Sequence, residues 1–165
     1  MKTVTYKPIG IIHTPFKEPA GTPIQPKAGK EVEGFIEILP EYVEGLADLE
    51  GFSHIILIYH FHRSKPCKLK VVPFMDDKER GVFATRTPSR PNPIGISVVS
   101  LVRIEGSKVF IRDLDILDST PILDIKPYVP VFDELEDIKI GWLKKRVEKL
   151  EETRDDGMIS PPDGC

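Results

Sequence analysis

The sequence predicts a mainly β protein that folds as one domain around a closed or nearly closed barrel. Apolar and polar residues alternate with a period of two along several segments, which is the pattern of β-strands. The chain also has 16 prolines among 165 residues. Proline disfavours helix because it fixes φ and donates no backbone hydrogen bond. A chain of this length buries a sufficient core without metal or disulfide support.

The expected strands follow one another along most of the chain. Val32–Ile38 alternates regularly, and Ile94–Ile104 with Lys108–Asp113 reads as a hairpin around a short turn. Ser53–His62 is apolar on both faces, which indicates a barrel wall with something packed outside it, such as a second subunit. Shorter strands are expected at Lys68–Val72 and Gly81–Thr85.

Helix is expected in two places. Glu41–Leu49 has the spacing of a short amphipathic helix, and Asp133–Glu152 places Ile138, Trp142 and further apolar residues at helical intervals. We therefore expect a barrel domain over residues 1–132, followed by a C-terminal helix and a flexible tail over residues 133–165.

Cysteine use and the N-terminal sequence bear on the cellular setting. Cys67 and Cys165 form no C-x-x-C motif, which argues for a reducing compartment and against a zinc ribbon or a disulfide framework. The start of the chain lacks the apolar core of a secretory signal, and no apolar run approaches the length of a membrane span. We expect a cytoplasmic protein that makes no use of a membrane.

Charge is distributed unevenly although the net charge is only −3. Glu31–Glu50 contains seven acidic residues and no basic ones, whereas Arg63–Arg90 contains eight basic and three acidic residues. A basic face that binds nucleic acid is one explanation. A solvated loop with a chance surplus of charge is the other.

Two common site classes lack support. The chain has no G-x-G, and both the dinucleotide fingerprint and the phosphate-binding loop need clustered glycines to let backbone approach a phosphate. His60 and His62 project to one strand face, but no further ligands are evident nearby, and a metal site needs its complete ligand set. We predict no metal.

The segment Gly81–Gly95 is the first candidate site. Three prolines stiffen it, and they fix the spacing of Arg86 and Arg90. A rigidly held guanidinium binds a carboxylate or phosphate at low entropic cost. A loop that only closes the barrel, with its arginines paired to nearby acids, is equally compatible with the sequence.

The segment Arg112–Tyr128 is the second candidate site. Its aspartates lie among apolar residues that pull the segment toward the core, and carboxylates placed there need partners. One explanation is that Lys126 pairs with Asp124 or Asp118. Another is that Asp115 binds ribose hydroxyls or an amino group of a ligand.

The motif Arg90-Pro-Asn-Pro-Ile-Gly95 occurs together with Asp124-Ile-Lys-Pro-Tyr128, and this combination is specific. Further motifs accompany it at Gly10–Phe16, Pro23–Pro26, Phe52–His54, Phe61–His62, Gly81–Arg86 and Asp118–Pro121. In these motifs the chain resembles, through about Phe132, the TrmO/TsaA-like family of S-adenosylmethionine-dependent tRNA methyltransferases.

The resemblance implies a single-sheet β-barrel that dimerises and binds S-adenosylmethionine in a groove. It also implies methyl transfer to N6 of threonylcarbamoyladenosine beside the tRNA anticodon. The cofactor contacts carried over by motif are Ile24, Gln25, Pro26, His62, Arg63, Arg86, Ile96, Arg112, Asp113, Leu114 and Asp115.

Further roles follow from that activity. Arg90 and Lys126 suit the threonine carboxylate or a phosphate of the substrate, and His62 and Asp118 are the candidates for the base. Ser119 stands where the family commonly has glycine, and only one helix and a tail follow the barrel here. The rival interpretation is a non-catalytic module that binds S-adenosylmethionine or RNA in the same groove.

Overall fold

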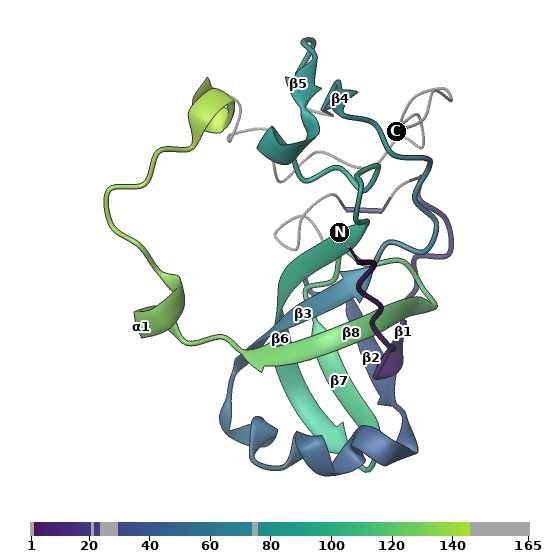
Figure 1. Cartoon of the computed structure of the whole chain (residues 1–165). Coiled ribbons are helices and arrows are strands. Elements are labelled where there is room, and N and C mark those ends of the chain that lie inside the picture. Colours follow the sequence, from purple (N-terminus) through teal and green to yellow (C-terminus); the bar gives the residue numbers. More distant parts are fainter. Residues whose placement is uncertain (1, 21, 24–29, 74–75, 146–165) are drawn as a thin grey trace.

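Six strands close into one antiparallel barrel in the order β1-β2-β7-β6-β3-β8 (Figure 1). The computed structural model describes residues 2–20, 22–23, 30–73 and 76–145. The prediction of a mainly β, single-sheet barrel is confirmed. The barrel strands are β1 Gly10–His13, β2 Glu33–Ile38, β3 His54–His60, β6 Ile94–Glu105, β7 Lys108–Arg112 and β8 Thr120–Pro127.

Strand β6, the longest strand of the barrel, pairs with its two neighbours along different parts of its length, and the barrel closes where β1 pairs with β8. The first half of β6 pairs with β3, with His60 opposite Ile94, and its second half pairs with β7. The register shifts between Leu101 and Arg103. An irregularity of this kind bends a strand and increases its twist, which lets one long strand turn the corner of a small barrel.

The barrel interior is an aliphatic core. Alternate residues of each strand point inward, which is why the period-two pattern of the sequence maps onto the core. Strand β3 contributes Ile55, Leu57 and Tyr59 to it, while Ile56 and Ile58 on its outer face are half-buried. The largest fully buried side chains of the barrel strands are Ile12, Ile36, Ile55, Leu57, Val99, Val109, Ile111 and Ile122.

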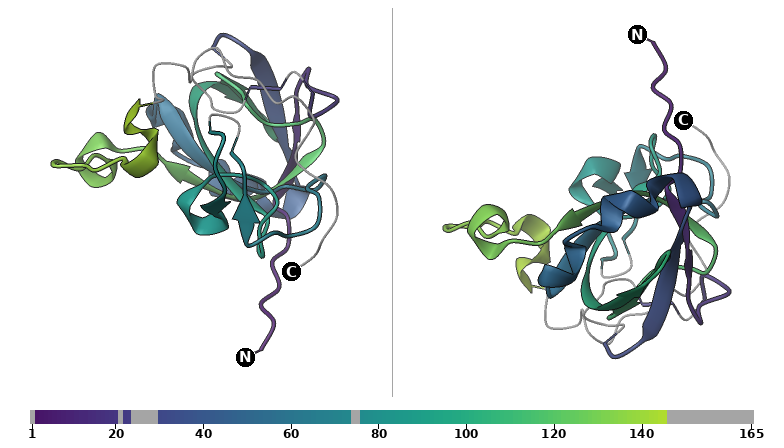
Figure 2. Two further views of the ribbon diagram at one scale, coloured as in Figure 1. Left: turned by 90° about the horizontal axis from the view of Figure 1, so that it is seen from above. Right: turned by 90° about the horizontal axis from the view of Figure 1, so that it is seen from below.

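One end of the barrel is covered by two short 3-10 helices, η2 Pro40–Leu46 and η3 Leu49–Gly51 (Figure 2). The predicted amphipathic helix over Glu41–Leu49 is therefore interrupted. The break lies at Asp48, whose φ of 64° is left-handed and incompatible with a continuous right-handed helix. Leu46 and Leu49 still pack against the barrel core, as an amphipathic pattern requires.

The opposite end carries a small module, residues 63–93, with strands β4 Lys70–Val71 and β5 Arg80–Gly81 and the 3-10 helix η4 Val82–Ala84 (Figure 1). The strand predicted for Gly81–Thr85 is thus wrong beyond Gly81. Val82 is buried, and the chain turns there to bury it.

Cys67 is disulfide-bonded, so the prediction against a disulfide is also wrong. The spacing of cysteines along a chain can identify metal-binding motifs, but it does not exclude a disulfide bond.

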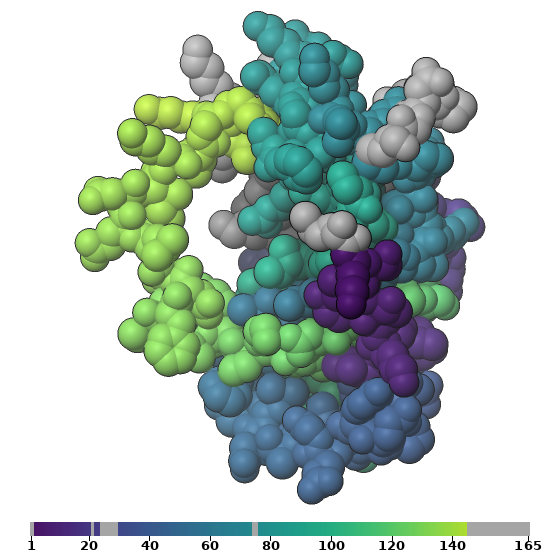
Figure 3. All heavy atoms as spheres, in the orientation of Figure 1, coloured from purple at the N-terminus to yellow at the C-terminus, as the bar shows by residue number. Residues whose placement is uncertain are grey.

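After β8 the chain forms an arm, residues 128–145, which stands off the barrel wall with an opening behind it (Figure 3). The arm contains α1 Pro130–Asp133 and the 3-10 helix η5 Gly141–Lys145. The helix predicted for Asp133–Glu152 does not form over the described residues 134–140. Asp137 and Gly141 have left-handed φ values of 55° and 54°. A short helix also needs packing to be stable in water, and the apolar residues Leu135 and Ile138 are exposed.

Among the described residues, no helix has the length and apolar character that crossing a membrane requires.

Candidate functional site

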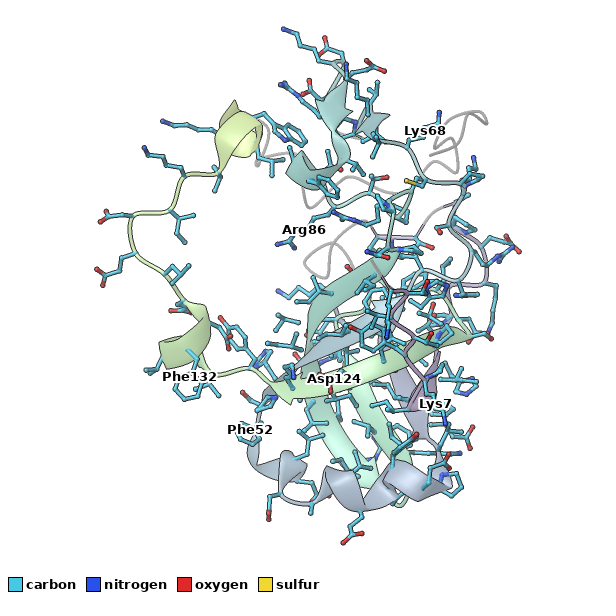
Figure 4. All side chains as sticks on the ribbon, in the orientation of Figure 1. Lys7, Phe52, Lys68, Arg86, Asp124 and Phe132 are labelled. Carbon is cyan, nitrogen blue, oxygen red and sulfur yellow. The ribbon has the colours of Figure 1, made fainter. Side chains whose placement is uncertain are left out.

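A cavity of about 790 Å³ lies between the barrel end and the module. Antiparallel pairing determines the position of the cavity, because it brings the end of β3 and the starts of β6 and β8 to the same end of the barrel. The segment that precedes β8 and the stiffened loop before β6 complete the walls. Figure 4 shows Arg86 at this end of the molecule, whereas Asp124 lies on the barrel wall.

Asp115 forms the polar floor of the cavity together with two strand residues. Ser97 Oγ in β6 donates a hydrogen bond of 2.7 Å to Asp115 Oδ1, and Tyr59 Oη in β3 lies 3.1 Å from Ser97 Oγ. Tyr59 packs against the backbone of Gly95, where a Cβ atom would collide with its ring. Glycine at this position therefore allows the chain Tyr59–Ser97–Asp115 to form.

The environment of Asp115 shifts its proton equilibrium. Burial raises the pKa of the Asp115 carboxyl to about 6, against the opposing effects of the Ser97 hydrogen bond and the positive charge of Arg86. The accessible part of this side chain faces the cavity, which it lines. At neutral pH the Asp115 carboxylate on the cavity floor is thus negatively charged. The hydrogen bond from Ser97 and the charge of Arg86 offset only part of the free-energy cost of removing this carboxylate from water. Such a carboxylate favours a cationic or hydrogen-bond-donating ligand.

His62 follows β3 directly and also lines the cavity. Its Nδ1 lies 3.2 Å from Thr120 Oγ1. Burial lowers the pKa of His62, and electrostatic interactions with Arg63 and His60 lower it further. The imidazole is therefore neutral at pH 7. When Nδ1–H donates to Thr120, Nε2 is the atom that accepts a proton.

Three arginines face the cavity from different directions. Arg86 comes from the module and is exposed. Arg90 Nη1 lies 3.4 Å from the carbonyl of Thr85, within the same loop. Arg63 donates to the carbonyl of Lys17 and to the carboxylate of Glu18, at 2.7 and 3.0 Å. Part of the donor capacity of Arg63 is thus engaged in joining the module to the N-terminal segment.

The four residues of the motif Arg112–Asp115 lie in different surroundings. Only Asp115 lines the cavity. Leu114 is fully buried in the core, Arg112 pairs with Glu31 at 3.1 Å, and Asp113 accepts hydrogen bonds from Ser100 and from the Glu31 amide. Asp113 adopts a left-handed φ of 68°. That turn sends its side chain away from the cavity while Asp115 enters it.

Two further predicted residues lie outside the cavity lining. Lys126 pairs with Asp124 at 2.8 Å, as the simpler explanation of the sequence anticipated. Asp118 accepts hydrogen bonds from the Thr14 amide and from Ser119 Oγ, and its ion pair with Lys17 measures 2.8 Å. It joins the loop before β8 to the N-terminal strand. Ile24, Gln25 and Pro26 lie outside the described residues.

The cavity is also lined by residues that were not predicted to belong to the site, notably Phe83 and Trp142. Phe83 lies inside the motif Gly81–Arg86, and its exposed position could not be read from a segment expected to be a strand. Trp142 was assigned to the apolar face of a helix. Its place in the cavity depends on the path of the arm, which no local pattern encodes.

The cavity thus combines a carboxylate, guanidinium groups, a neutral imidazole and apolar walls. This set suits a polar organic molecule that carries both charges and a planar ring. Among the described residues, no three potential ligands gather as a metal site would require.

Comparison with known proteins places these features in a family. The family model described as the tRNA-methyltransferase O N-terminal domain matches residues 11–134. The chain belongs to this family. The match spans the barrel strands from the second residue of β1 onward and the module, and it includes the cavity lining except Trp142 and Leu143.

Relatives of the TrmO family extend the comparison. A probable S-adenosyl-L-methionine-binding protein of Pyrococcus abyssi is 63% identical over 94% of this chain and 85% of its own length. A human tRNA (adenine(37)-N6)-methyltransferase is 34% identical over 80% of this chain, which spans 32% of that protein. The crystal structure of TrmO from Pseudomonas aeruginosa superimposes with a TM-score of 0.72 and 39% identity, over 86% of this chain and 63% of that one.

Proposed function

We propose that this chain is an S-adenosylmethionine-dependent methyltransferase that acts in the cytoplasm on N6 of threonylcarbamoyladenosine next to the tRNA anticodon. The observation that carries the proposal is the gathering of five motif residues from distant segments in one cavity. These residues are His62, Arg63, Arg86, Ile96 and Asp115. Family membership supports the reaction class, and relatives whose names describe S-adenosylmethionine binding or tRNA adenine methylation support cofactor and substrate.

The cavity fits the proposed cofactor on chemical grounds. The Asp115 carboxylate can accept hydrogen bonds from an amino group or from the ribose hydroxyls of the cofactor. The Arg86 guanidinium can bind the cofactor's carboxylate. Ile96, which is 55% exposed, supplies apolar surface on the same wall. When bound, S-adenosylmethionine supplies the electrophilic methyl group.

The protein's own contribution is to orient the acceptor and to accept a proton. The N6 of a threonylcarbamoyl adenosine is a urea-like nitrogen of low nucleophilicity, so loss of its proton must accompany methylation. His62 is neutral at pH 7 and lines the cavity, which makes it the proposed base. Asp118, the other candidate, is engaged by Lys17, Thr14 and Ser119. Correct positioning of the reacting groups contributes on the order of 7–11 kcal/mol in ideal cases.

The charge distribution supports tRNA as the partner. The basic segment of the sequence, Arg63–Arg90, forms the module that covers the cavity, and Arg63, Lys65, Lys70 and Arg86 are exposed there. The acidic segment Glu31–Glu50 forms β2 and the helices η2 and η3, which cover the opposite barrel end. This polarity favours approach of a polyanion to the cavity.

We also propose that the protein forms a homodimer through the outer face of β6. Ile94, Ile96 and Val98 are 39%, 55% and 37% exposed on this face, which is unusual for consecutive outward positions of a soluble barrel. A second copy would cover Val98 and would border the cavity that Ile94 and Ile96 line. The replacement Val98→Asp should then halve the mass measured by light scattering, and an unchanged dimer would place the interface elsewhere.

The deciding experiment is methyl transfer with S-adenosylmethionine labelled in its methyl group. The acceptors are tRNA carrying threonylcarbamoyladenosine and, as control, the same tRNA without that modification. Nucleosides are separated and identified by mass spectrometry. Label on the hypermodified adenosine alone is the expected result.

The opposite outcome has a defined meaning. Binding of S-adenosylmethionine without any label on tRNA would contradict the proposal and favour a non-catalytic binding module. Label on the unmodified tRNA would keep the reaction class and overturn the substrate assignment.

A further inference from the structure

Phe83 and Trp142 form one wall of the cavity that the proposed cofactor site does not use; we call this pair the aromatic wall. Phe83 is 77% exposed, although a phenyl ring gains most from burial. It sits in η4, one residue before Ala84. A large apolar ring held open at the edge of a cavity indicates a surface that a ligand covers.

The wall is assembled from two separate parts of the chain. Trp142 Nε1 donates a hydrogen bond of 2.8 Å to the carbonyl of Ala84, so the indole of η5 is fixed beside the turn that carries Phe83. The guanidinium of Arg80 lies 5.5 Å from the centre of the Trp142 ring. Arg80 is itself held by Asp76 at 2.7 Å. Because these contacts fix the indole before any ligand arrives, little ordering is left for binding.

The aromatic wall and the polar floor of the cavity come from different parts of the chain, while Arg86 lies in the same module as Phe83. Asp115, His62 and Thr120 lie on or near the barrel floor, whereas the wall belongs to the module and the arm. The volume of about 790 Å³ is in the upper part of the range for small-molecule sites. The cavity thus has room for a second planar group beyond the one that the polar end holds.

We propose that the aromatic wall binds the acceptor base of the nucleic acid by stacking. This inference rests on the proposed methyltransferase function and names the residues that select its acceptor. Enzymes that modify a base take it out of the stack and hold it against aromatic side chains, because every base offers a π-face. The exposed basic residues of the same module hold the backbone on either side of the extruded nucleotide.

Fluorescence tests the stacking directly, because Trp142 is the single tryptophan of the chain. The probe is an anticodon stem-loop that carries threonylcarbamoyladenosine, added in the presence of S-adenosylhomocysteine to prevent turnover. The matched control is the same stem-loop with an abasic site at that position. We expect saturable quenching by the first RNA and none by the second. Equal quenching by both would overturn the proposal, because both retain the phosphates.

Replacement of Phe83 tests the second half of the wall. Base–aromatic stacking is lost in Phe83→Ala, so kcat/KM for methyl transfer should fall about 5- to 150-fold, while Phe83→Tyr keeps the ring and should retain activity. Phe132→Ala is the matched control, since Phe132 is 78% exposed and lies outside the cavity. The affinity for S-adenosylmethionine, measured by calorimetry, should be unchanged in all three variants.

The outcomes separate the two proposals. A parallel loss of cofactor affinity in Phe83→Ala would assign the wall to the adenine of the cofactor and overturn the inference. Full activity of Phe83→Ala would overturn it as well. Absence of methyl transfer by the unmodified protein would instead refute the proposed function, and the fluorescence comparison would still decide whether the wall holds a base.

Discussion

Ser97 and Asp115 are joined by a hydrogen bond of 2.7 Å, and through it Asp115 is linked to the buried hydroxyl of Tyr59. The three residues come from β6, from the segment before β8 and from β3. Burial raises the pKa of Asp115 to about 6. The ionised carboxylate thus lowers the free energy of unfolding, which is common for groups that serve binding or catalysis.

Replacement of this carboxylate should stabilise the free protein at neutral pH. The folded pKa of about 6 exceeds the ordinary value of 3.8, so the folded state binds the proton more tightly. The stability contributed by Asp115 is fully present below pH 4 and is lost as the pH rises through 6. The loss is about 3 kcal/mol, since each pKa unit corresponds to about 1.4 kcal/mol. Asp115→Asn should remove this decline.

Urea unfolding of both proteins from pH 4 to pH 8 measures the effect. The two free energies should be similar near pH 4, diverge as the pH rises from 4 to 6, and differ by a constant amount above that, with the variant more stable. Asp124→Asn is the control, because Asp124 forms an exposed pair with Lys126. A difference between Asp115→Asn and the unmodified protein that stays constant with pH would contradict the assignment.

Asp118 should behave in the opposite way. Burial raises its pKa, but the hydrogen bonds from Lys17, the Thr14 amide and Ser119 outweigh that effect, and the pKa lies below the ordinary value. Its contribution to stability is therefore present above about pH 4 and is lost as the pH falls through the folded pKa. Asp118→Asn should cost about 1–3 kcal/mol at pH 7 and less in acid. Unfolding curves at pH 7 and pH 3 check this, and equal losses at both would refute it.

Ser119→Gly should increase stability. Ser119 has a φ of 63°, in the left-handed region that glycine adopts without strain. Relief of that strain exceeds the entropic cost of glycine, so a gain of about 0.5–1 kcal/mol is expected. Gly106→Ala, at a φ of 60°, is the reverse control and should destabilise. Thermal unfolding measures both, and a less stable Ser119→Gly would show that the Ser119 hydroxyl matters more than the backbone.

Arg86→Ala should weaken binding of S-adenosylmethionine about 10- to 100-fold, because a charge-assisted hydrogen bond to the cofactor is removed. Titration calorimetry gives the affinity. Arg103→Ala serves as control, since Arg103 pairs with Glu105 in the half of β6 that lies away from the cavity. If the affinity of Arg86→Ala for S-adenosylmethionine were unchanged, Arg86 would not be a cofactor-binding residue.

His62→Gln should slow methyl transfer about 10²- to 10⁴-fold, the usual contribution of a general base. Since the pKa of His62 lies below 6.5, the rate of the unmodified enzyme should be constant around pH 7 and fall only in more acidic solution. Single-turnover rates from pH 5 to pH 8 provide the test. An acidic limb that persists in His62→Gln would assign the proton transfer to another group.

Sequence patterns predicted the barrel strands β2, β3, β6 and β7, but not β1 or β8. The alternation in Val32–Ile38 and the apolar Ser53–His62 each correspond to a strand with one face in the core. Local patterns were insufficient for helices. Asp48, Asp137 and Gly141 interrupt the predicted ones with left-handed backbone, because a helix without a complete packing partner is only marginally stable.

The sequence by itself determined the four central strands of the chain, β2, β3, β6 and β7, the stiffened loop with Arg86 and Arg90, and the candidate aspartates. Only the tertiary structure decided which aspartate enters the cavity and that Trp142 is hydrogen-bonded to the turn that carries Phe83. The physical reason is that alternation along a strand fixes which face a side chain occupies. Closure of a barrel and the path of a distant arm depend instead on contacts between segments remote in sequence.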